Sequence, residues 1–215
     1  MNENGTDTRQ RILQAAQELF FSYGIRSITM DEISRHLSIS IQTLYRFFED
    51  KHQIVDTLTR FEISDSVRCS LDIARQAKDP IDEILQSMEY MTKKLAGWHP
   101  SMVYDLQKYH PKSWDEFRKF SEEHMLNAVM RNLKKGIRQG LYRNDINVPV
   151  LARLRIEQVS LAMNPHVFPP AKFELRKVEM ELLNHFLQGI LTLKGRKLLD
   201  QHEVKYKSKK QKNVA

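Results

Sequence analysis

Apolar side chains recur at helical spacing along most of the chain. Between residues 6 and 24 they fall on one face of a helix, at Ile12, Ala15, Ala16, Leu19, Phe20 and Tyr23. Spacings of three, four, seven and eight residues predict an amphipathic helix, with Asp7 and Gln10 as a capping pair and Gly24 as its end. No run alternates in the way that predicts a β-strand. We therefore predict an all-α protein of about nine helices.

Two short helices are predicted after Gly24. Thr29 stands three residues before Glu32, the spacing of a capping box, and Ser40 is placed to cap the second helix. Each helix carries one apolar stripe: Met30, Ile33 and Leu37 in the first, and Ile41, Leu44 and Phe48 in the second. Helices this short are marginal alone. The three should pack as a helix-turn-helix unit, whose second helix enters the major groove of DNA.

The rest of the chain continues the helical pattern in longer segments. Asp50 before Gln53, Asp79 before Pro80, and Ser113 before Glu116 mark three helix starts. The expected helices are a connector from about 50 into the seventies, 80–95, a short piece within 98–111, 113–137, 148–163 and 173–193. We thus expect a DNA-binding domain at 1–50, a helical ligand-binding and dimerisation domain at 51–195, and a basic C-terminal tail at 196–215.

Charge is distributed unevenly along the 215 residues, whose net charge is +7. Residues 1–60 carry seven basic and eight acidic side chains, a net −1, whereas residues 194–215 carry eight and two, a net +6. The tail from Lys194 is expected to be solvated and frayed, and could attract DNA only non-specifically. A DNA-binding prediction must therefore rest on geometry rather than on total charge.

The sequence offers little support for an enzyme or a metal site. The histidines are scattered without metal-ligand spacing, and no phosphate loop, nucleophile elbow or carboxylate pair stands out. The single cysteine, Cys69, cannot form an intramolecular disulfide. No signal segment and no long apolar run is present. We expect a cytoplasmic protein with no catalytic residues, no cofactor, no metal and no membrane association.

Residues 15–55, AAQELFFSYGIRSITMDEISRHLSISIQTLYRFFEDKHQIV, resemble the DNA-binding domain of TetR-family transcriptional regulators. The matching features are a helix that ends in Tyr-Gly, Thr29 at the start of the next helix, and the motif Thr43-Leu44-Tyr45-x-x-Phe48-x-x-Lys51. The resemblance implies a homodimeric, repressor-type protein. It also implies a small-molecule pocket among the middle helices and a dimer interface formed by the last two long helices.

The resemblance assigns candidate DNA contacts by position. Ile41, Gln42, Thr43 and Tyr45 would lie at the groove-facing start of the recognition helix, and Thr29, Arg46 and Lys51 would meet phosphates. The side chains suit these roles, because an amide can pair with both edge atoms of adenine and a threonine methyl can pack on thymine. The alternative interpretation of the same residues is an ordinary solvated helix face.

Two departures from the family pattern affect this segment. The turn before the recognition helix often contains Ala-Gly, but this chain has Leu37-Ser38. Ser38 must therefore adopt a left-handed conformation or use a different turn. Where many members have a basic residue and a glycine, this chain has Ile41 and Gln42. The operator sequence cannot be transferred from relatives.

Candidates for a pocket and a dimer interface come from the second domain. Aromatic and methionine side chains could surround an apolar or aromatic ligand, or could be plain core: Tyr90, Met91, Trp98, Met102, Tyr104, Phe117, Phe120 and Met125. The candidate interface residues on the last long helices are Leu154, Leu161, Leu182, Leu183, Phe186 and Ile190.

Our functional hypothesis is a ligand-responsive transcriptional regulator. It would bind a palindromic double-stranded DNA operator as a homodimer, act as a repressor, and be released by a small-molecule effector through the connector helix near Asp50. The alternative is a helical ligand-binding or dimerisation protein that has lost specific DNA binding. The net charge of −1 in residues 1–60 and the Leu37-Ser38 turn motivate that alternative.

Overall fold

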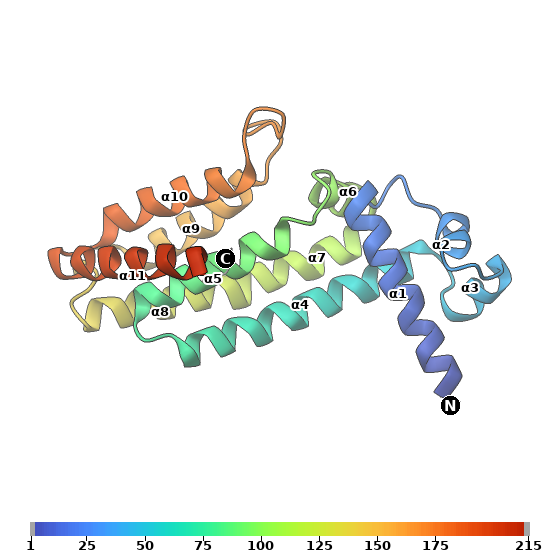
Figure 1. Ribbon diagram of the computed structural model, residues 1–215, viewed down its shortest axis with the longest axis horizontal. Coiled ribbons are helices and arrows are strands. Elements are labelled where there is room, and N and C mark those ends of the chain that lie inside the picture. The colour runs from blue at the N-terminus through green and yellow to red at the C-terminus, as the bar shows by residue number, and fades with distance from the viewer. Residues whose placement is uncertain (1–2, 213–215) are drawn as a thin grey trace. The chain divides into compact units, whose positions relative to one another are not determined.

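The computed structural model describes the backbone of residues 3–212 and the side chains of residues 6–202. This part of the chain is helical, and its only β-type pairing is an isolated bridge between Tyr142 and Leu191. Figure 1 shows the helices in chain order. They are α1 (Glu3–Tyr23), α2 (Met30–His36), α3 (Ile41–Phe47), α4 (Lys51–Gln76), α5 (Pro80–Leu95), α6 (Met102–Tyr109), α7 (Pro111–Phe120), a π-helical segment (Ser121–Met125), α8 (Leu126–Arg138), α9 (Val148–Ala162), α10 (Leu175–Ile190) and α11 (Leu193–Lys212).

These helices form two compact units. The first comprises Met1–Val67 and Lys94–Phe120, and the second comprises Arg68–Lys93 and Ser121–Ala215. The all-α prediction is confirmed, although residues 3–212 contain eleven α-helices where about nine were expected. The domain boundary near residue 50 stays a prediction. No helix of the described chain has both the length and the low polarity that a membrane span requires.

The core of the first unit is assembled from the apolar stripes of α1, α2 and α3. The side chains of Phe20, Ile33, Leu44 and Phe48 are buried together, as the sequence predicted. The same cluster includes Ile54 and Val55 from the start of α4, and Met102 and Leu106 of α6 pack against it. The helix-turn-helix unit is therefore held by α4 and α6 as well as by its own three helices (Figure 1).

The second unit is built around the buried sides of α5, α8, α10 and α11. Tyr142 lies in its centre, directly against α8, where a Cβ added at Gly136 would come within 2.0 Å of the tyrosine ring. Its hydroxyl donates to Asn132 Oδ1 at 3.1 Å, and Asn132 Nδ2 donates to the carbonyl of Pro80 at 2.9 Å. These two hydrogen bonds link α8 to the start of α5 inside an otherwise apolar core.

Three predicted helix boundaries are wrong. The first helix begins at Glu3, so Asp7 lies inside it and is not its cap. Helix α7 begins at Pro111, and Ser113 donates its hydroxyl hydrogen bond to Asp56 of α4 instead of capping. The single helix expected over 113–137 is interrupted by the π-helical segment. Two other starts are confirmed, because Asp50 accepts from the backbone of Gln53, and Asp79 accepts from the backbone of Ile81.

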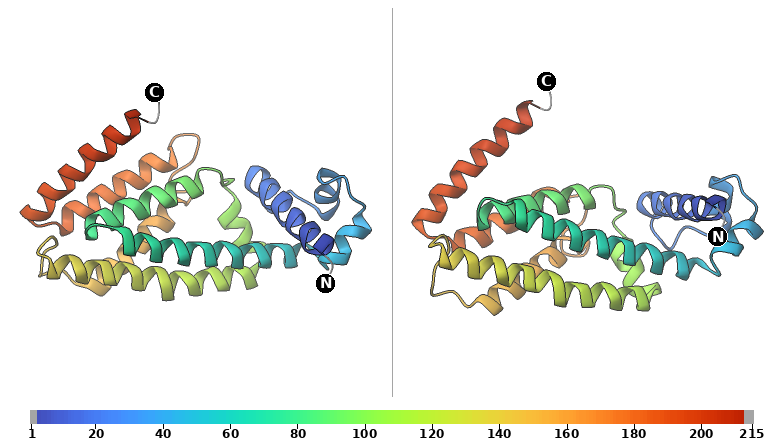
Figure 2. Two further views of the ribbon diagram at one scale, coloured as in Figure 1. Left: turned by 60° about the horizontal axis from the view of Figure 1, so that its bottom comes forward. Right: turned by 90° about the horizontal axis from the view of Figure 1, so that it is seen from below.

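The C-terminal segment is helical where a frayed tail was expected. Leu199 and His202 of α11 are buried, and His202 Nε2 lies 2.7 Å from Asp79 Oδ2. These contacts hold the first turns of α11 in the second unit, and the helix then diverges from α10 in both views of Figure 2. The side chains from residue 203 onward, on which the predicted attraction of DNA depends, lie outside the described residues.

Candidate nucleic-acid interface

Helix α3 forms because its start is capped and one of its faces is buried. Ser40 Oγ accepts a hydrogen bond from the backbone N–H of Thr43 at 3.1 Å, as a serine N-cap does. Leu44 is completely buried on the inner side, and Phe48, the C-cap residue, is buried beside it. A seven-residue helix is thereby fixed in orientation by its cap and two apolar anchors.

The opposite face of α3 is open to solvent. Gln42, Tyr45 and Arg46 are exposed, with 51% of the Tyr45 surface accessible, while Ile41 and Thr43 are half-buried. One turn therefore presents an amide, a phenol and a guanidinium, which between them can accept and donate hydrogen bonds to base edges and phosphates. The structure brings these five predicted residues together on one short helix.

The turn between α2 and α3 uses the left-handed conformation. Ser38 has a φ of 55°, its N–H donates to the carbonyl of Arg35 at 3.1 Å, and Ile39 N–H donates to the carbonyl of Ser34 at 3.0 Å. Of the two alternatives that the sequence left open, the chain adopts the strained backbone. The hydrogen bonds of this turn set the direction in which α3 leaves α2.

Thr29 caps α2 as predicted. Its hydroxyl accepts from Glu32 N–H at 3.2 Å, and its own N–H donates to Glu32 Oε2 at 2.7 Å, which completes the capping box. The hydrogen bonds from Thr29 lower the pKa of Glu32. The ionised carboxylate, with Asp31 beside it, would weaken the attraction of a phosphate to this turn. The predicted phosphate contact of Thr29 stays a prediction.

The ammonium group of Lys51 makes three hydrogen bonds within the protein. Lys51 Nζ donates to the carbonyls of Ile25, Arg26 and Ile28, at 3.1, 3.4 and 2.8 Å. Burial lowers the pKa of Lys51, while the charges of Asp105 and Glu32 oppose this shift. Three acceptors already occupy the three N–H donors of a lysine. Lys51 therefore fixes the loop between α1 and α2, and its predicted phosphate contact stays a prediction.

Asp105 of α6 fixes the same loop and was not singled out from the sequence. Its buried Oδ2 accepts from the N–H of Arg26 and from the hydroxyl of Ser101, both at 3.0 Å. Gly24 makes this approach possible, because a Cβ there would lie 2.5 Å from Ser101 Oγ. The only sequence signal was an aspartate among the apolar positions of a short helix.

The predicted pocket residues are divided between the two units. Trp98, Met102, Tyr104, Phe117 and Phe120 belong to the first unit, whereas Tyr90, Met91 and Met125 belong to the second. Met102 packs against the helix-turn-helix core and Tyr104 is 47% exposed, so these two residues are respectively a core and a surface residue here. Trp98 packs on Phe21 with ring centroids 5.4 Å apart.

The predicted interface residues are divided by exposure. Leu154 and Leu161 of α9 are 46% and 40% exposed, and Leu182 is partly buried. The other three, Leu183, Phe186 and Ile190, are at most 4% exposed within the single chain. They belong to the core of the second unit and offer almost no surface within the single chain, and their place in a dimer interface stays a prediction.

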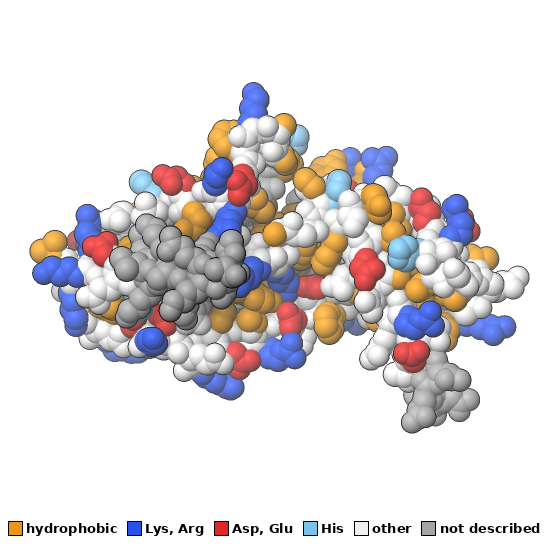
Figure 3. Space-filling model, in the orientation of Figure 1, with side chains coloured by type: hydrophobic (Ala, Val, Ile, Leu, Met, Phe, Trp, Pro, Cys, Tyr) orange, Lys and Arg blue, Asp and Glu red, His pale blue; other side chains and the backbone are white. Residues whose placement is uncertain are grey.

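Charged side chains of both signs are interspersed on one face of the protein. On the face shown in Figure 3, Lys and Arg side chains are interspersed with Asp and Glu side chains in both units. Among the described residues, no group of three or more His, Cys, Asp or Glu side chains is arranged to hold a metal ion. Because charges of both signs are interspersed, recognition of DNA by α3 would depend on shape and hydrogen bonding more than on a strong positive field.

Known proteins resemble this chain in sequence and in fold. Residues 12–58 match the family profile described as bacterial regulatory proteins, tetR family. An HTH-type transcriptional regulator of Staphylococcus aureus strain MRSA252 is 29% identical over 150 residues, which cover 60% of this chain and 81% of that protein. The matched profile begins at Ile12, the first buried residue among the described side chains of α1, and ends inside α4, so it includes the whole helix-turn-helix core.

Solved structures of regulators share the fold over nearly their whole length. A TetR-family transcriptional regulator from Marinobacter aquaeolei VT8 superimposes with a TM-score of 0.74 at 24% identity, covering 96% of this chain and 99% of that one. Thermus thermophilus FadR, a TetR-family repressor solved in complex with lauroyl-CoA, gives a TM-score of 0.56 at 20% identity, covering 86% and 95%. The similarity therefore extends through the second unit.

Proposed function

Because the chain belongs to the TetR family of bacterial transcriptional regulators, we propose that it represses transcription by binding a palindromic operator as a homodimer, and that a small-molecule effector releases it. The observation that carries this proposal is the open first turn of α3, capped by Ser40 and anchored from behind by Leu44. Each copy would insert one such turn into the major groove of one half-site. The site of action is the cytoplasm, where the operator lies.

A homodimer is supported by an apolar stripe on α9. Val150, Leu154 and Leu161 are 60%, 46% and 40% exposed and follow one face of that helix. Met180 of the neighbouring α10 is 46% exposed. Pairing of α9 and α10 with their copies would remove these side chains from water at about 25 cal/mol per Å² of apolar surface. Two half-site contacts would then act together on one operator.

Release by an effector requires that the ligand bind more tightly to a form of the dimer that does not fit the operator. Couplings of about 1 to 3 kcal/mol are typical of such systems. The lauroyl-CoA complex of the Thermus thermophilus repressor supports an organic effector as a class, although the effector of this chain is not inferred from it. Helix α4, which carries both Lys51 and Asp56, is the proposed connector.

The test is selection of random duplex DNA by the purified protein, followed by titration of the selected site. Tyr45→Ala should weaken binding about tenfold, because it removes one groove or phosphate contact. Tyr104→Ala is the matched control, since Tyr104 is a tyrosine of similar exposure in the same unit, but on α6. Enrichment of a palindrome that Tyr104→Ala retains and Tyr45→Ala loses would support the proposal.

The contrary result would be recovery of no sequence, together with the same weak, salt-sensitive binding in all three proteins. That result would favour the alternative function, a ligand-binding or dimerisation protein without an operator. Lys51 is left unchanged in this test because its three carbonyl contacts make it part of the fold.

A further inference from the structure

A buried ion pair with unpartnered atoms lies between α9 and α10. The side chains of Arg155 and Glu179 are only 11% and 5% exposed, and Arg155 Nη2 stands 3.7 Å from Glu179 Oε2. The same nitrogen lies 3.9 Å from the sulfur of Met88 on α5. At 3.7 Å the two charges attract, but the contact is too long for a good hydrogen bond. The pair is therefore only loosely engaged.

Three enclosed polar atoms on α9 and α10 have no hydrogen-bond partner among the described residues. They are Arg155 Nη1, Glu179 Oε1 and, one turn further along α9, Gln158 Oε1. Leaving such atoms unpaired in a protein interior is unfavourable, and native proteins rarely leave three together. Burial raises the pKa of Glu179 and lowers that of Arg155, although each residue opposes the shift of the other.

A second copy of the chain cannot supply the missing partners from outside. The three atoms are enclosed within the single chain, whereas the neighbouring Met180 of α10 is 46% exposed. Only a molecule that enters the second unit can reach them. The other buried residues of the two helices, among them Ile156 and Val178, are largely apolar, so such a molecule would need an apolar body.

We propose that Arg155, Gln158 and Glu179 are the polar anchor of the effector site, and that the effector carries a neutral head group with one acceptor and two donors on an apolar body. The unpartnered atoms define this class, because Nη1 donates and the two oxygens accept. A primary carboxamide satisfies all three atoms at once. The ion pair sums to zero charge, so a carboxylate or ammonium head would leave a buried charge unbalanced.

This inference rests on the proposed regulator function, but its binding test does not involve DNA. Octanamide is the probe, and octanoate and octyltrimethylammonium are comparators with the same chain length and opposite charges. We expect octanamide to raise the Tm of the full-length protein and to bind at least tenfold more tightly than either comparator in calorimetry. Preference for a charged probe would overturn the proposed head group.

Two variants locate the binding. Gln158→Leu removes one acceptor without changing charge and should weaken octanamide binding about tenfold or more, whereas Gln188→Leu, on the exposed side of α10, should not. The double variant Arg155→Met plus Glu179→Met removes both charges together, and such replacements are often neutral or stabilising, so it should fold. It should no longer respond to octanamide.

The remaining outcomes are equally decisive. Unchanged octanamide binding by the double variant would place the probe elsewhere and overturn the site. No Tm response of the native protein to any of the three probes would mean that water alone satisfies the cluster, which overturns the effector class as well. Selection of an operator by the same protein would show that the regulator function stands even if this inference fails.

Discussion

Ser38 lies in the turn between α2 and α3, and its backbone is strained. Its φ of 55° is the left-handed conformation, which costs a residue with a Cβ about 1 to 2 kcal/mol. Glycine adopts the same angles without that cost. A glycine variant would keep only about half of this gain in stability, because glycine also makes the unfolded chain more flexible. The strain persists because the two hydrogen bonds across the turn and the buried anchors of α3 fix the chain on both sides.

Ser38→Gly should therefore raise the free energy of unfolding by about 0.5 to 1 kcal/mol in urea denaturation. Ser64→Gly is the matched control, because Ser64 is exposed inside α4, where glycine should instead lower stability by about 0.5 kcal/mol. A loss of stability in both variants would mean that the serine hydroxyl, not the backbone, governs this turn.

Much of the first unit could be predicted at the scale of single residues. The caps Thr29, Ser40 and Asp50 act within three residues of themselves, so local spacing was sufficient to identify them. Lys51 and Arg155 could not be assigned in this way. Their partners lie more than twenty residues away, in a loop and on another helix, and only the packing of the helices brings them together.

At the scale of elements, the junction between α6 and α7 buries a histidine. His110 is 3% exposed, its ring centroid lies 4.6 Å from that of His52, and its Nδ1 has no hydrogen-bond partner among the described residues. Burial, together with the positive charges of His52 and Lys51, lowers the pKa of His110 to about 4, against the opposing charges of Asp56 and Asp105. The folded protein therefore holds this ring neutral.

Acid should destabilise the protein through this junction. Between pH 6.5 and about 4 the unfolded chain takes up a proton at His110 and the folded chain does not, so stability falls as the pH falls through that window. The loss between pH 7 and pH 4.5 should be about 2 to 2.5 kcal/mol. Urea denaturation at pH 7 and 4.5 should show a smaller loss in His110→Gln than in the native protein.

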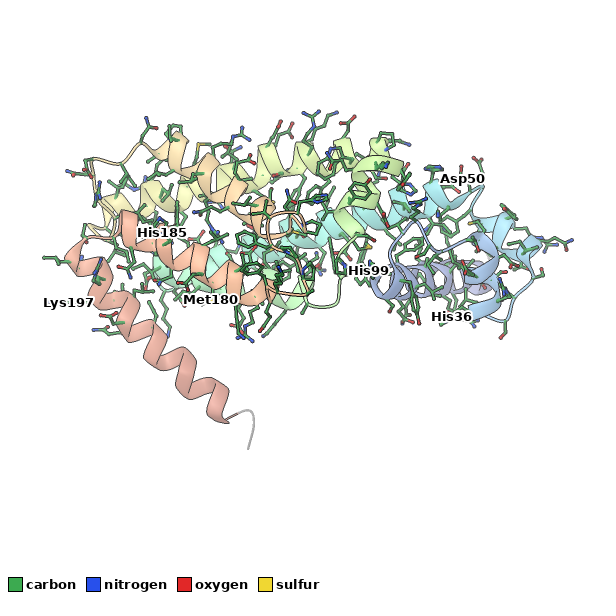
Figure 4. The ribbon with its side chains drawn as sticks, turned by 90° about the horizontal axis from the view of Figure 1, so that it is seen from above. His36, Asp50, His99, Met180, His185 and Lys197 are labelled. Carbon is green, nitrogen blue, oxygen red and sulfur yellow. The ribbon has the colours of Figure 1, made fainter. Side chains whose placement is uncertain are left out.

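The control is His36→Gln, which changes an exposed histidine of α2 (Figure 4) and should lose as much stability as the native protein. Equal losses in all three proteins would assign the acid sensitivity to other groups.

Elements were predicted well where an apolar stripe and a cap agreed, and poorly where neither was present. The π-helical segment Ser121–Met125 interrupts a continuous helical period, and no residue of that stretch marks the change. The helix after Leu193 was missed because the charge of the segment suggested a solvated tail. Its folded start depends on the burial of Leu199 and on the contact of His202 with Asp79, which is 123 residues away along the chain.

At the scale of the whole molecule, the exposed stripe on α9 predicts the oligomeric state. Leu154→Glu plus Leu161→Glu should convert a dimer into a monomer of 25.4 kDa in sedimentation analysis, because burying two carboxylates in an apolar interface costs several kcal/mol. Affinity for the selected operator should fall with the dimer, since each monomer would hold only one half-site.

Leu71→Glu supplies the comparison, because Leu71 is 45% exposed on α4, away from the stripe, and its variant should stay dimeric.

Phe186→Ala tests the role of a buried side chain of α10 in the same way. Phe186 is 4% exposed in its own chain, so its truncation should lower the free energy of unfolding by about 3 to 5 kcal/mol instead of loosening a dimer selectively. A double variant that remained dimeric would move the interface off α9, whereas a stable monomer produced by Phe186→Ala would show that the core of the second unit rearranges when two copies meet.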